Sequence, residues 1–393
     1  DSAGVLTLDS GAAINIEPAA GSAILLDGTI SVDAGVVTGA TSITSTAFVG
    51  SGASLTSLPI TGLRPSASPI IINGAMSVAQ RGVSFAHPDS NSNNFTVDRF
   101  NFVTGAIGVY TSIQESLTSG AAFDAGFRKA ARIDCTTAQA SPADGDYFYF
   151  EHKIEAQDCS SFKKGSSDAE TMTVAFWVKS NKTGTSQLTV KDGDNDRICA
   201  GTYAISSADT WEHKVINIAA DTSNAFTHDN GAGYIYEWWL GGGSTYTSGT
   251  APTAWEARAD ADRGANNLAI NDNTANDWAI TGVQVEVGTY TAATLPPFQH
   301  RPHSEELTLC HRYFERFDYD KSGGGVAGMA GQCHETDIMY GSFHYQPKRV
   351  DPSISTSTIS GSNFRILHTG TATNVTSFAF NPSRNTARIG AST

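Results

Sequence analysis

Trp278-Ala-Ile-Thr-Gly-Val-Gln-Val-Glu-Val-Gly288 opens the stretch that decides how this chain is divided, and Leu295-Pro-Pro-Phe-Gln-His-Arg301 and Ser304-Glu-Glu-Leu-Thr-Leu-Cys-His-Arg-Tyr-Phe314 follow it. Apolar residues alternate in the first part, which predicts a strand that ends at Gly288. The Pro-Pro pair lacks backbone donors and stops regular structure. We therefore expect a large β domain to end here and a small C-terminal domain to follow.

A short helix is expected after the prolines, within residues 300–317. Ser304 is suited to be its N-cap, and two glutamates follow in the first turn, where the helix dipole favours negative charge. Leu307, Cys310 and Phe314 would lie on one face of this helix.

The region before the junction, residues 70–299, contains all six tryptophans and should hold the largest hydrophobic core of the chain. Its short apolar or alternating runs predict a two-sheet jelly-roll sandwich. Trp238 and Trp239 are adjacent, so one should point inward and the other outward, toward a glycan or, more readily, toward another subunit. The predicted strands are 70–72, 97–103, 129–134, 147–154, 172–178, 187–190, 198–203, 211–218, 234–240 and 277–287.

Residues 1–58 carry apolar clusters, such as Ile24-Leu25-Leu26 and Val36-Val37, separated by glycines. This pattern predicts short strands and turns. A single chain with so little apolar surface cannot offset its conformational entropy, so we expect three copies to intertwine into a trimeric β shaft. The alternative is a disordered Ala/Ser/Thr linker. Three prolines in residues 59–69 mark a linker or collar.

Residues 318–393 contain five short apolar runs after a Gly-rich turn, at 326–329, 338–345, 354–358, 364–368 and 377–381, and the last residues form a candidate for one more strand. They predict a small β domain that needs partners for stability. The predicted architecture is therefore all-β: an N-terminal intertwined trimeric β shaft, a central β-sandwich (jelly roll), a short helix and a small C-terminal β domain.

The junction also resembles a known family. Gln284-Val-Glu286-Val-Gly288, Pro297-Phe298-Gln299-His-Arg301 and Glu306-Leu-x-x-Cys310-x-Arg312-Tyr313-Phe314 resemble motifs of tailed-phage virion proteins, namely tail fibres, head fibres and host-recognition proteins of marine phages. Val285 and Gln299 depart from the Leu and Glu of the family pattern. Residues 73–82 and 96–102 resemble the start of the same β domain, and residues 48–58 resemble a repeat of trimeric phage fibres.

The resemblance implies a carbohydrate-binding-module-like jelly roll in a protein of the virion, on the tail or capsid surface. We expect a homotrimeric tail fibre that adsorbs to a host surface polysaccharide. One alternative is a head fibre or structural tail component without its own receptor, and a second is a glycan-degrading tailspike. Because the chain starts at Asp1, we also expect further residues before it, which would attach to other virion proteins.

Composition excludes several other classes. The net charge of −14 disfavours nucleic acid, whose binding depends on Lys and Arg contacts to phosphates. No apolar run reaches the roughly 18 residues that a membrane span needs. The five cysteines are an odd number at low density, which predicts buried free thiols rather than a disulfide scaffold.

Five residues in loop-like sequence are candidate glycan contacts, because aromatic faces stack on sugar rings and carboxylates or amides bind hydroxyls. They are Tyr246, Trp255, Asp260, Asp262 and Asn266. The alternative for Trp255 is that it closes the sandwich edge, since aromatic residues are more often buried than displayed.

We expect no metal and no other cofactor. Asp192-Gly-Asp194-Asn-Asp196 mimics the start of a Ca²⁺ loop but lacks its later Gly and distal Glu, so a turn is expected. A second set has spacing too irregular for a zinc site. It consists of His300, His303, Cys310, His311, Cys333 and His334.

The sequence also contains no recognisable catalytic motif. A Gly-x-Ser-x-Gly elbow, a phosphate-binding loop and a His-Glu-x-x-His helix are all missing. Acids such as Glu237 and Asp260 are not distinguishable from ordinary surface carboxylates, so no glycosidase pair stands out. We therefore expect the chain not to be an enzyme.

Overall fold

The structure, a computed structural model, describes residues 69–87, 92–316, 331–333, 338–353, 365–368, 371–374, 377–384 and 386–392. The predicted shaft over residues 1–58 lies outside the described residues, as does the predicted linker except for residue 69. The predicted strands at 326–329 and 354–358 lie outside them as well.

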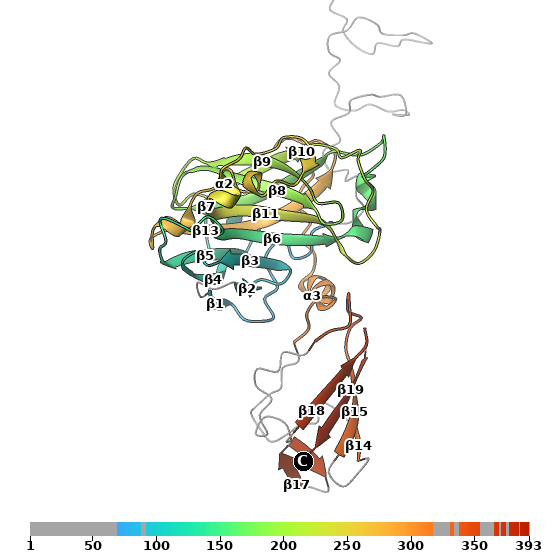
Figure 1. Ribbon diagram of the computed structural model, residues 1–393. Helices are drawn as coiled ribbons and strands as arrows, with labels where there is room; N and C mark the ends of the chain where they lie inside the picture. Colours follow the sequence, from blue (N-terminus) through green and yellow to red (C-terminus); the bar gives the residue numbers. More distant parts are fainter. Residues whose placement is uncertain are drawn as a thin grey trace, which may run out of the picture. The chain divides into compact units, whose positions relative to one another are not determined.

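The predicted all-β fold is confirmed, since two antiparallel sheets form the central region (Figure 1). In spatial order, the six-stranded sheet contains β1 (Ser84–His87), β4 (Val109–Ser116), β5 (Lys129–Thr137), β13 (Asp277–Val287), β7 (Met172–Ser180) and β10 (Glu212–Ile218). The seven-stranded sheet contains β12 (Glu256–Ala257), β9 (Arg197–Ile205), β8 (Gly184–Asp192), β11 (Ala232–Gly242), β6 (Tyr147–Glu155), β3 (Phe100–Gly105) and β2 (Ser92–Asn94).

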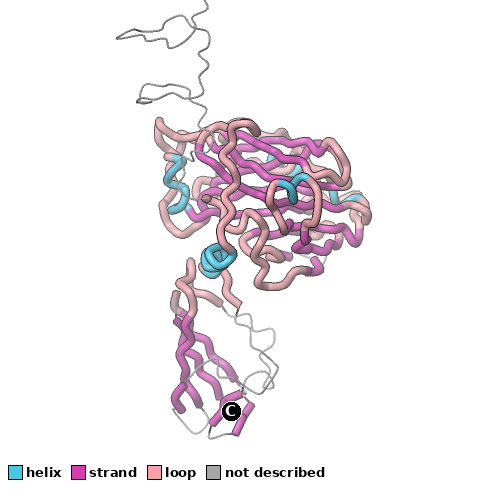
Figure 2. The backbone as a smooth tube through the Cα atoms, turned by 180° about the vertical axis from the view of Figure 1, so that it is seen from behind, coloured by secondary structure: helices cyan, strands magenta, loops and turns pink. Residues whose placement is uncertain are grey.

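Short helical segments occupy connections between strands, as Figure 2 shows. They are α1 (Ala121–Asp124), α2 (Ser244–Thr247) and the 3₁₀ turns η1 (Ala156–Phe162), η2 (Asp260–Asp262) and η3 (Ile270–Asp272). The segment from α2 to η3 matters most below, because it covers part of the outer face of the seven-stranded sheet.

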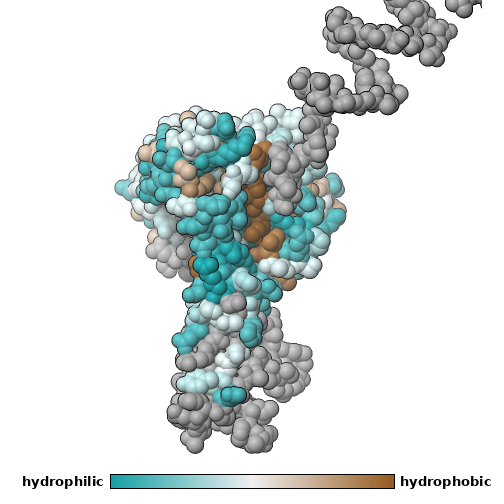
Figure 3. Space-filling model, turned by 90° about the vertical axis from the view of Figure 1, so that its right-hand side faces the viewer, coloured by the Kyte–Doolittle hydropathy of each residue, from teal (hydrophilic) through white to brown (hydrophobic). Residues whose placement is uncertain are grey.

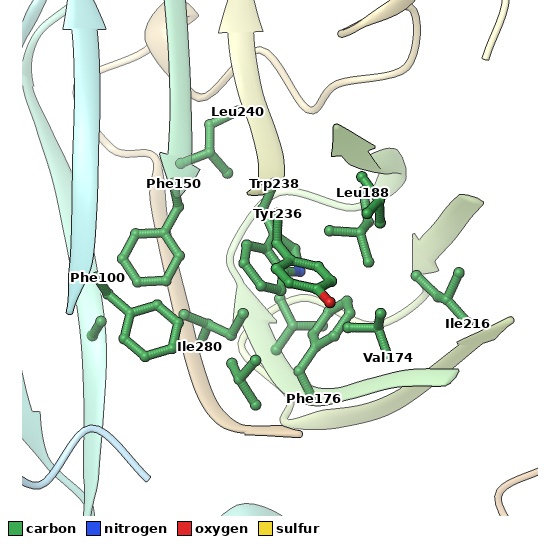
Figure 4. Close-up of a cluster of buried hydrophobic side chains, with 14 of the residues drawn as sticks. Phe100, Phe150, Val174, Phe176, Leu188, Ile216, Tyr236, Trp238, Leu240 and Ile280 are labelled. Atoms are coloured by element: carbon green, nitrogen blue, oxygen red, sulfur yellow. The ribbon is translucent and has the colours of Figure 1, made fainter. Parts of the chain in front are cut away.

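The core lies between the two sheets and follows from period-two alternation. In β7, Met172, Val174, Phe176 and Val178 are all buried in it. Figure 4 shows Trp238 of the seven-stranded sheet close to Phe176 of the six-stranded sheet. The Trp238 ring lies 5.7 Å from the Phe176 ring in an edge-to-face arrangement, a favourable geometry for aromatic pairs.

One predicted strand of the central region is wrong, and the others are confirmed. Residues 70–72 form bends rather than a strand, although Ile71 is buried in the core. An apolar run can be buried without pairing to another strand, so hydrophobicity alone could not distinguish a strand from a buried irregular segment. The sequence prediction missed β4, whose polar residues dilute its apolar alternation.

The junction helix α3 (His303–His311) begins before Ser304, so the predicted N-cap is wrong. Its N-cap is Pro302, and no side chain caps it. Glu306 is buried in the first turn instead, where it accepts the Asn73 backbone N–H at 2.5 Å and pairs with Arg301 at 3.1 Å. The helix start is therefore fixed by contacts with the beginning of the sandwich.

The end of α3 is fixed to β6 through Glu155. Arg312 donates to both carboxylate oxygens of Glu155, at 2.7 and 2.6 Å, and the Tyr313 hydroxyl donates to it at 2.5 Å. Burial would raise the pKa of Glu155, but these hydrogen bonds hold it below its usual value. The Arg349 N–H donates to the Arg312 carbonyl at 2.9 Å, which extends the contact into the C-terminal segment.

The C-terminal region is also β-structure where it is described. A four-stranded sheet contains β14 (Gly331–Cys333), β15 (Ile338–His344), β19 (Thr386–Ser392) and β18 (Ser377–Pro382) in spatial order, and β16 (Arg365–His368) pairs with β17 (Thr371–Asn374). These confirm the predicted strands at 338–345, 364–368 and 377–381 and a further strand at the end of the chain.

The surface and the thiols agree with the composition. On the face seen in Figure 3, hydrophilic residues cover much of the described surface, and a narrow hydrophobic strip crosses the sandwich. Within the described ranges, no helix is both long and apolar enough to cross a membrane. Cys135, Cys159, Cys199 and Cys310 are free and buried, as predicted.

A buried ammonium group holds three loops together at one end of the sandwich. The Nζ atom of Lys164 lies 2.7 Å from Asp192 and 3.3 Å from Asp221, and its side chain is 1% exposed. It also donates to the Ser223 carbonyl at 2.9 Å. Asp192 accepts the Asp194 N–H at 2.9 Å, so the Asp-rich segment forms the expected turn.

Lys164→Met should destabilise the fold strongly, because it leaves two buried carboxylates without this cation. We expect a loss of about 3–5 kcal/mol in the free energy of unfolding, measured by urea denaturation. Lys163→Met is the matched control, since Lys163 pairs with Glu170 at the surface, and it should leave the midpoint unchanged. Equal losses for the two variants would contradict the assigned role of Lys164.

Two buried histidines should make the fold sensitive to mild acid. The Nε2 atom of His87 is hydrogen-bonded to the hydroxyl oxygen of Ser112 at 2.6 Å. Burial lowers the pKa of His87 to about 4. Burial, with a contribution from Arg99, also lowers the pKa of His152. The unfolded chain binds these protons near pH 6.5 and the folded chain does not, so stability is full above pH 6.5 and is lost as pH falls toward 4.

This predicts a slope of up to about 1.4 kcal/mol per pH unit for each histidine between pH 6.5 and 5, measured by urea unfolding at several pH values. His87→Gln should reduce the slope by the share of one histidine. The exposed His303 is the control, and His303→Gln should keep the slope of the native chain. An unchanged slope in His87→Gln would refute the assignment.

Candidate glycan-binding groove

A groove of about 430 Å³ lies on the outer face of the seven-stranded sheet, over β3 and β6. The two strands are antiparallel, and their register places Asn101 opposite Glu151 and Val103 opposite Tyr149. Inward neighbours such as Phe150 belong to the core, so alternation alone turns this second set outward. The groove is lined by Phe95, Arg99, Asn101, Val103, Thr104, Tyr147, Tyr149, Glu151 and Lys153.

Two partly exposed tyrosines form the aromatic part of the groove. Tyr147 and Tyr149 lie two residues apart on β6, and their ring centroids are 5.9 Å apart. Tyr246 contacts Tyr147 at 5.6 Å, and Trp239 contacts Tyr149 at 4.9 Å. Neighbouring rings therefore hold both tyrosines in place, which lowers the entropy that they would lose on binding a ligand.

Polar groups lie beside these rings. Glu151 is 7% exposed, and Lys153 pairs with it at 3.0 Å. Burial raises the pKa of Glu151, Lys153 opposes that rise, and Glu237 on the neighbouring strand adds to it. With Asn101 opposite, the groove offers hydrogen-bond acceptors and donors next to flat apolar surfaces, which is the combination that recognises a small polar ligand.

The segment from α2 to η3, called the covering loop below, covers the adjacent part of the same sheet face. Arg263 binds both oxygens of Glu237, at 2.8 and 3.1 Å, and its guanidinium lies 5.1 Å from the Trp239 ring centroid. Gly264 packs so closely on Trp239 that an added Cβ would lie 2.5 Å from the ring. The groove is therefore confined to β3 and β6, while β11 and β8 are closed off.

This cover corrects the expectation for the adjacent tryptophans. Trp238 points into the core and Trp239 points outward, as alternation predicted, but Trp239 is 0% exposed. It is therefore neither a free glycan contact nor a surface for another subunit, because Arg263, Gly264 and Tyr246 cover it.

Glu151 and Glu237 are cross-strand neighbours, which raises the question of a glycosidase pair. Glu237 is 1% exposed, and Arg263 and the Trp239 indole N–H, at 3.2 Å, occupy its oxygens. A carboxylate held this way cannot reach a ligand in the groove. Glycoside hydrolysis normally uses two carboxyl groups, and Glu151 is the one carboxylate in the described lining of the groove.

The structure spreads the five predicted contacts along the covering loop. Tyr246 touches the groove through its contact with Tyr147, while Asp260 pairs with Arg263 at 3.3 Å. Asp262 accepts the Thr250 N–H at 2.7 Å, and the Asn266 N–H donates to Gln187 at 3.1 Å. Within this arrangement they shape the loop, and their contact with a sugar stays a prediction.

Trp255 lies apart from the groove. Its indole N–H donates to the Ala219 carbonyl at 2.7 Å, and its ring lies 5.7 Å from Tyr234, so it packs on the core. These contacts agree with the alternative that it closes the sandwich edge.

Sequence reasoning missed the groove residues on β6. The run Tyr147-Phe-Tyr-Phe-Glu-His-Lys153 has aromatic residues on both faces of one strand, and that was the available signal. A strand with an aromatic outer face has something to bind or be covered by. Among the described residues, no group of three or more His, Cys, Asp or Glu side chains could hold a metal ion.

Comparisons with known proteins identify no family for the chain. No protein-family model matches it. No curated protein matches it either.

Several solved structures match part of the chain at low identity. One is the enzymatically active domain of tailspike protein 4 of bacteriophage CBA120, at 12% identity over 56% of this chain and 21% of that one, with a TM-score of 0.25. Another is the family 11 carbohydrate-binding module of Clostridium thermocellum with a mixed-linked tetrasaccharide, at 7% identity over 53% and 99%, with a TM-score of 0.26. A third is TmCBM61 with β-1,4-galactotriose, at 10% identity over 56% and 99%, with a TM-score of 0.25. TM-scores this low add nothing to the strand topology, on which the assignment of a sandwich rests.

Proposed function

We propose that this chain binds a glycan in the groove over β3 and β6, without cleaving it. The observation that carries the proposal is the position of Tyr147 and Tyr149, half-buried side by side, next to the buried Glu151. Flat rings take the apolar faces of sugars, and Glu151 and Asn101 take hydroxyl groups. The proposal that binding is not catalytic rests on Glu237, whose oxygens Arg263 holds.

We further propose that the chain acts in a virion, as a tail fibre that adsorbs to a host surface polysaccharide. The junction motifs support this through their resemblance to tailed-phage virion proteins. The alternative is a head fibre or structural tail component without a receptor of its own. One measurement distinguishes the two roles, because only the adsorbing tail fibre requires that the groove bind bacterial surface glycans.

The groove is tested by substitutions at Tyr149 against a bacterial glycan array, with affinities of the positive glycans measured by isothermal titration calorimetry. Tyr149→Ala should weaken binding at least about tenfold, because it removes a preformed stacking face. Tyr149→Phe keeps the ring and should bind within about threefold of the native chain.

Tyr290→Ala is the matched control, since Tyr290 is also a partly exposed tyrosine but follows β13 of the other sheet. It should bind as the native chain does. A Tyr149→Ala protein with native affinity would show that the glycan binds elsewhere, and an array without any positive glycan would favour the purely structural alternative.

The homotrimer is a separate proposal and rests on the apolar clusters in residues 1–58. Three copies would share the small core that one chain cannot form. Light scattering on the full chain should give three times the 41.3 kDa of one chain. A single particle of one chain's mass would overturn it.

A further inference from the structure

Arg99 lies at one end of the groove and is held there by the C-terminal junction. It precedes β3 and lines the groove together with Lys153. Its guanidinium lies 3.4 Å from the centroid of the Tyr313 ring, and one Nη donates to the Lys153 carbonyl. Tyr313 is itself fixed by Glu155 on β6. The position of the Arg99 head group is therefore determined before any ligand arrives.

Arg99 carries a positive charge that no carboxylate among the described residues neutralises. Its Nε–H is buried and has no hydrogen-bond partner among the described residues. No carboxylate within those residues forms an ion pair with it, and Arg312 and Tyr313 already occupy the nearby Glu155. A buried donor on a charged group without a partner costs free energy and is rare in folded proteins.

Other buried or half-buried arginines of the sandwich and its junction show the contrast. Arg263 pairs with Glu237 at 2.8 Å, Arg301 with Glu306 at 3.1 Å and Arg312 with Glu155 at 2.6 Å. Among these, Arg99 alone lines the groove and lacks a carboxylate within the described residues. Arg99 therefore brings to the groove a positive charge that no described carboxylate neutralises.

The backbone of Arg99 has a positive φ angle. Its φ of 74° is in the left-handed region, which side chains other than glycine adopt at a cost of order 1–3 kcal/mol. The fold retains this conformation, and it directs the guanidinium to the end of the groove.

We infer that the groove takes an acidic saccharide, whose carboxylate or sulfate group binds Arg99 while its sugar rings stack on Tyr147 and Tyr149. The inference rests on the proposed function of the groove. From Lys153 to Tyr147 the strand covers about 20 Å, so the anionic group and the stacked rings occupy different positions. The guanidinium can bind either anion through charge-assisted hydrogen bonds from its Nη groups.

Glu151 decides the orientation of such a ligand. Lys153 pairs with Glu151 at 3.0 Å, so Arg99 is the cation in the described lining of the groove that has no carboxylate partner among the described residues. An anion placed next to Glu151 would be repelled, whereas hydroxyl groups there would donate to it. The acidic group therefore belongs at the Arg99 end, and neutral, hydroxyl-rich parts of the sugar belong between Glu151 and the tyrosines.

The test uses the full chain and matched pairs of polysaccharides. Each uronic-acid polymer is compared with its carboxyl-reduced form, and each sulfated polymer with its desulfated form, by biolayer interferometry. We expect the native chain to bind at least one acidic member about tenfold or more tightly than its neutral partner. The two series show whether the recognised group is a carboxylate or a sulfate.

Arg99→Gly is the informative variant, because glycine accepts the positive φ and removes the guanidinium. It should abolish the preference for the acidic member, while the neutral member keeps its affinity within about twofold. Arg99→Lys keeps the charge without the fork and should retain part of the preference. Arg128→Gly is the control, since Arg128 also stacks on an aromatic ring, that of Phe123 at 3.9 Å, but lies outside the groove.

Each outcome decides one of the two proposals. If the native chain binds the acidic and neutral polymers equally, and Tyr149→Ala loses both, the inference of an acidic ligand is wrong. Glycan binding in the groove is then still supported. An acidic preference that survives in Arg99→Gly also overturns the inference of an acidic ligand. Failure of every polymer to bind, or binding that Tyr149→Ala does not weaken, overturns the groove function and this inference together. The ratio measured on the native chain decides even if a variant fails to fold.

Discussion

The alternation of side chains along β6 and β11 is the constraint on which the rest of this structure depends. Every second residue of these neighbouring strands enters the core between the sheets, as Phe150 and Trp238 do. The residues between them must then face the other side, where Tyr149 and Glu151 line the groove and Trp239 and Glu237 lie beneath the covering loop. Core and candidate site are thus two faces of the same strands, and a shift of register by one residue would exchange them.

The covering loop and the junction define the two limits of the groove by different physical means. Arg263 closes one side through a bidentate pair with Glu237 and contacts with three aromatic rings. At the end, Arg99 stacks on Tyr313 without an ion pair among the described residues. The ion pair of Arg263 with Glu237 holds the covering loop on the sheet, so that part of the sheet face is covered. The sheet face beside Arg99 remains open, and in our proposal its charge binds the anionic group of the ligand.

The junction motif acquires a structural meaning from its contacts. Glu306 and Arg301 hold the start of α3 to Asn73, while Arg312 and Tyr313 hold its end to Glu155. Arg301, Glu306, Arg312 and Tyr313 belong to the motifs on which the resemblance to phage virion proteins depends. Their roles are to attach the segment after β13 to the sandwich and, through Tyr313, to support a wall of the groove. Tyr313, which follows α3, thus helps to position Arg99, a residue that lines the groove.

The sequence by itself determined the all-β class, most strands of the sandwich and the place of the junction, because period-two alternation and prolines act over a few residues. It also showed that one of Trp238 and Trp239 must face outward. Only the tertiary structure decided that Trp239 is covered and that Tyr147 and Tyr149 are not. That outcome depends on the path of a loop that begins after β11, and on pairs such as Asn101 and Glu151 that are adjacent only across strands. Contacts between residues distant in sequence, such as Arg99 with Tyr313, leave no local pattern, and the candidate site depends on them as well as on the local run of β6.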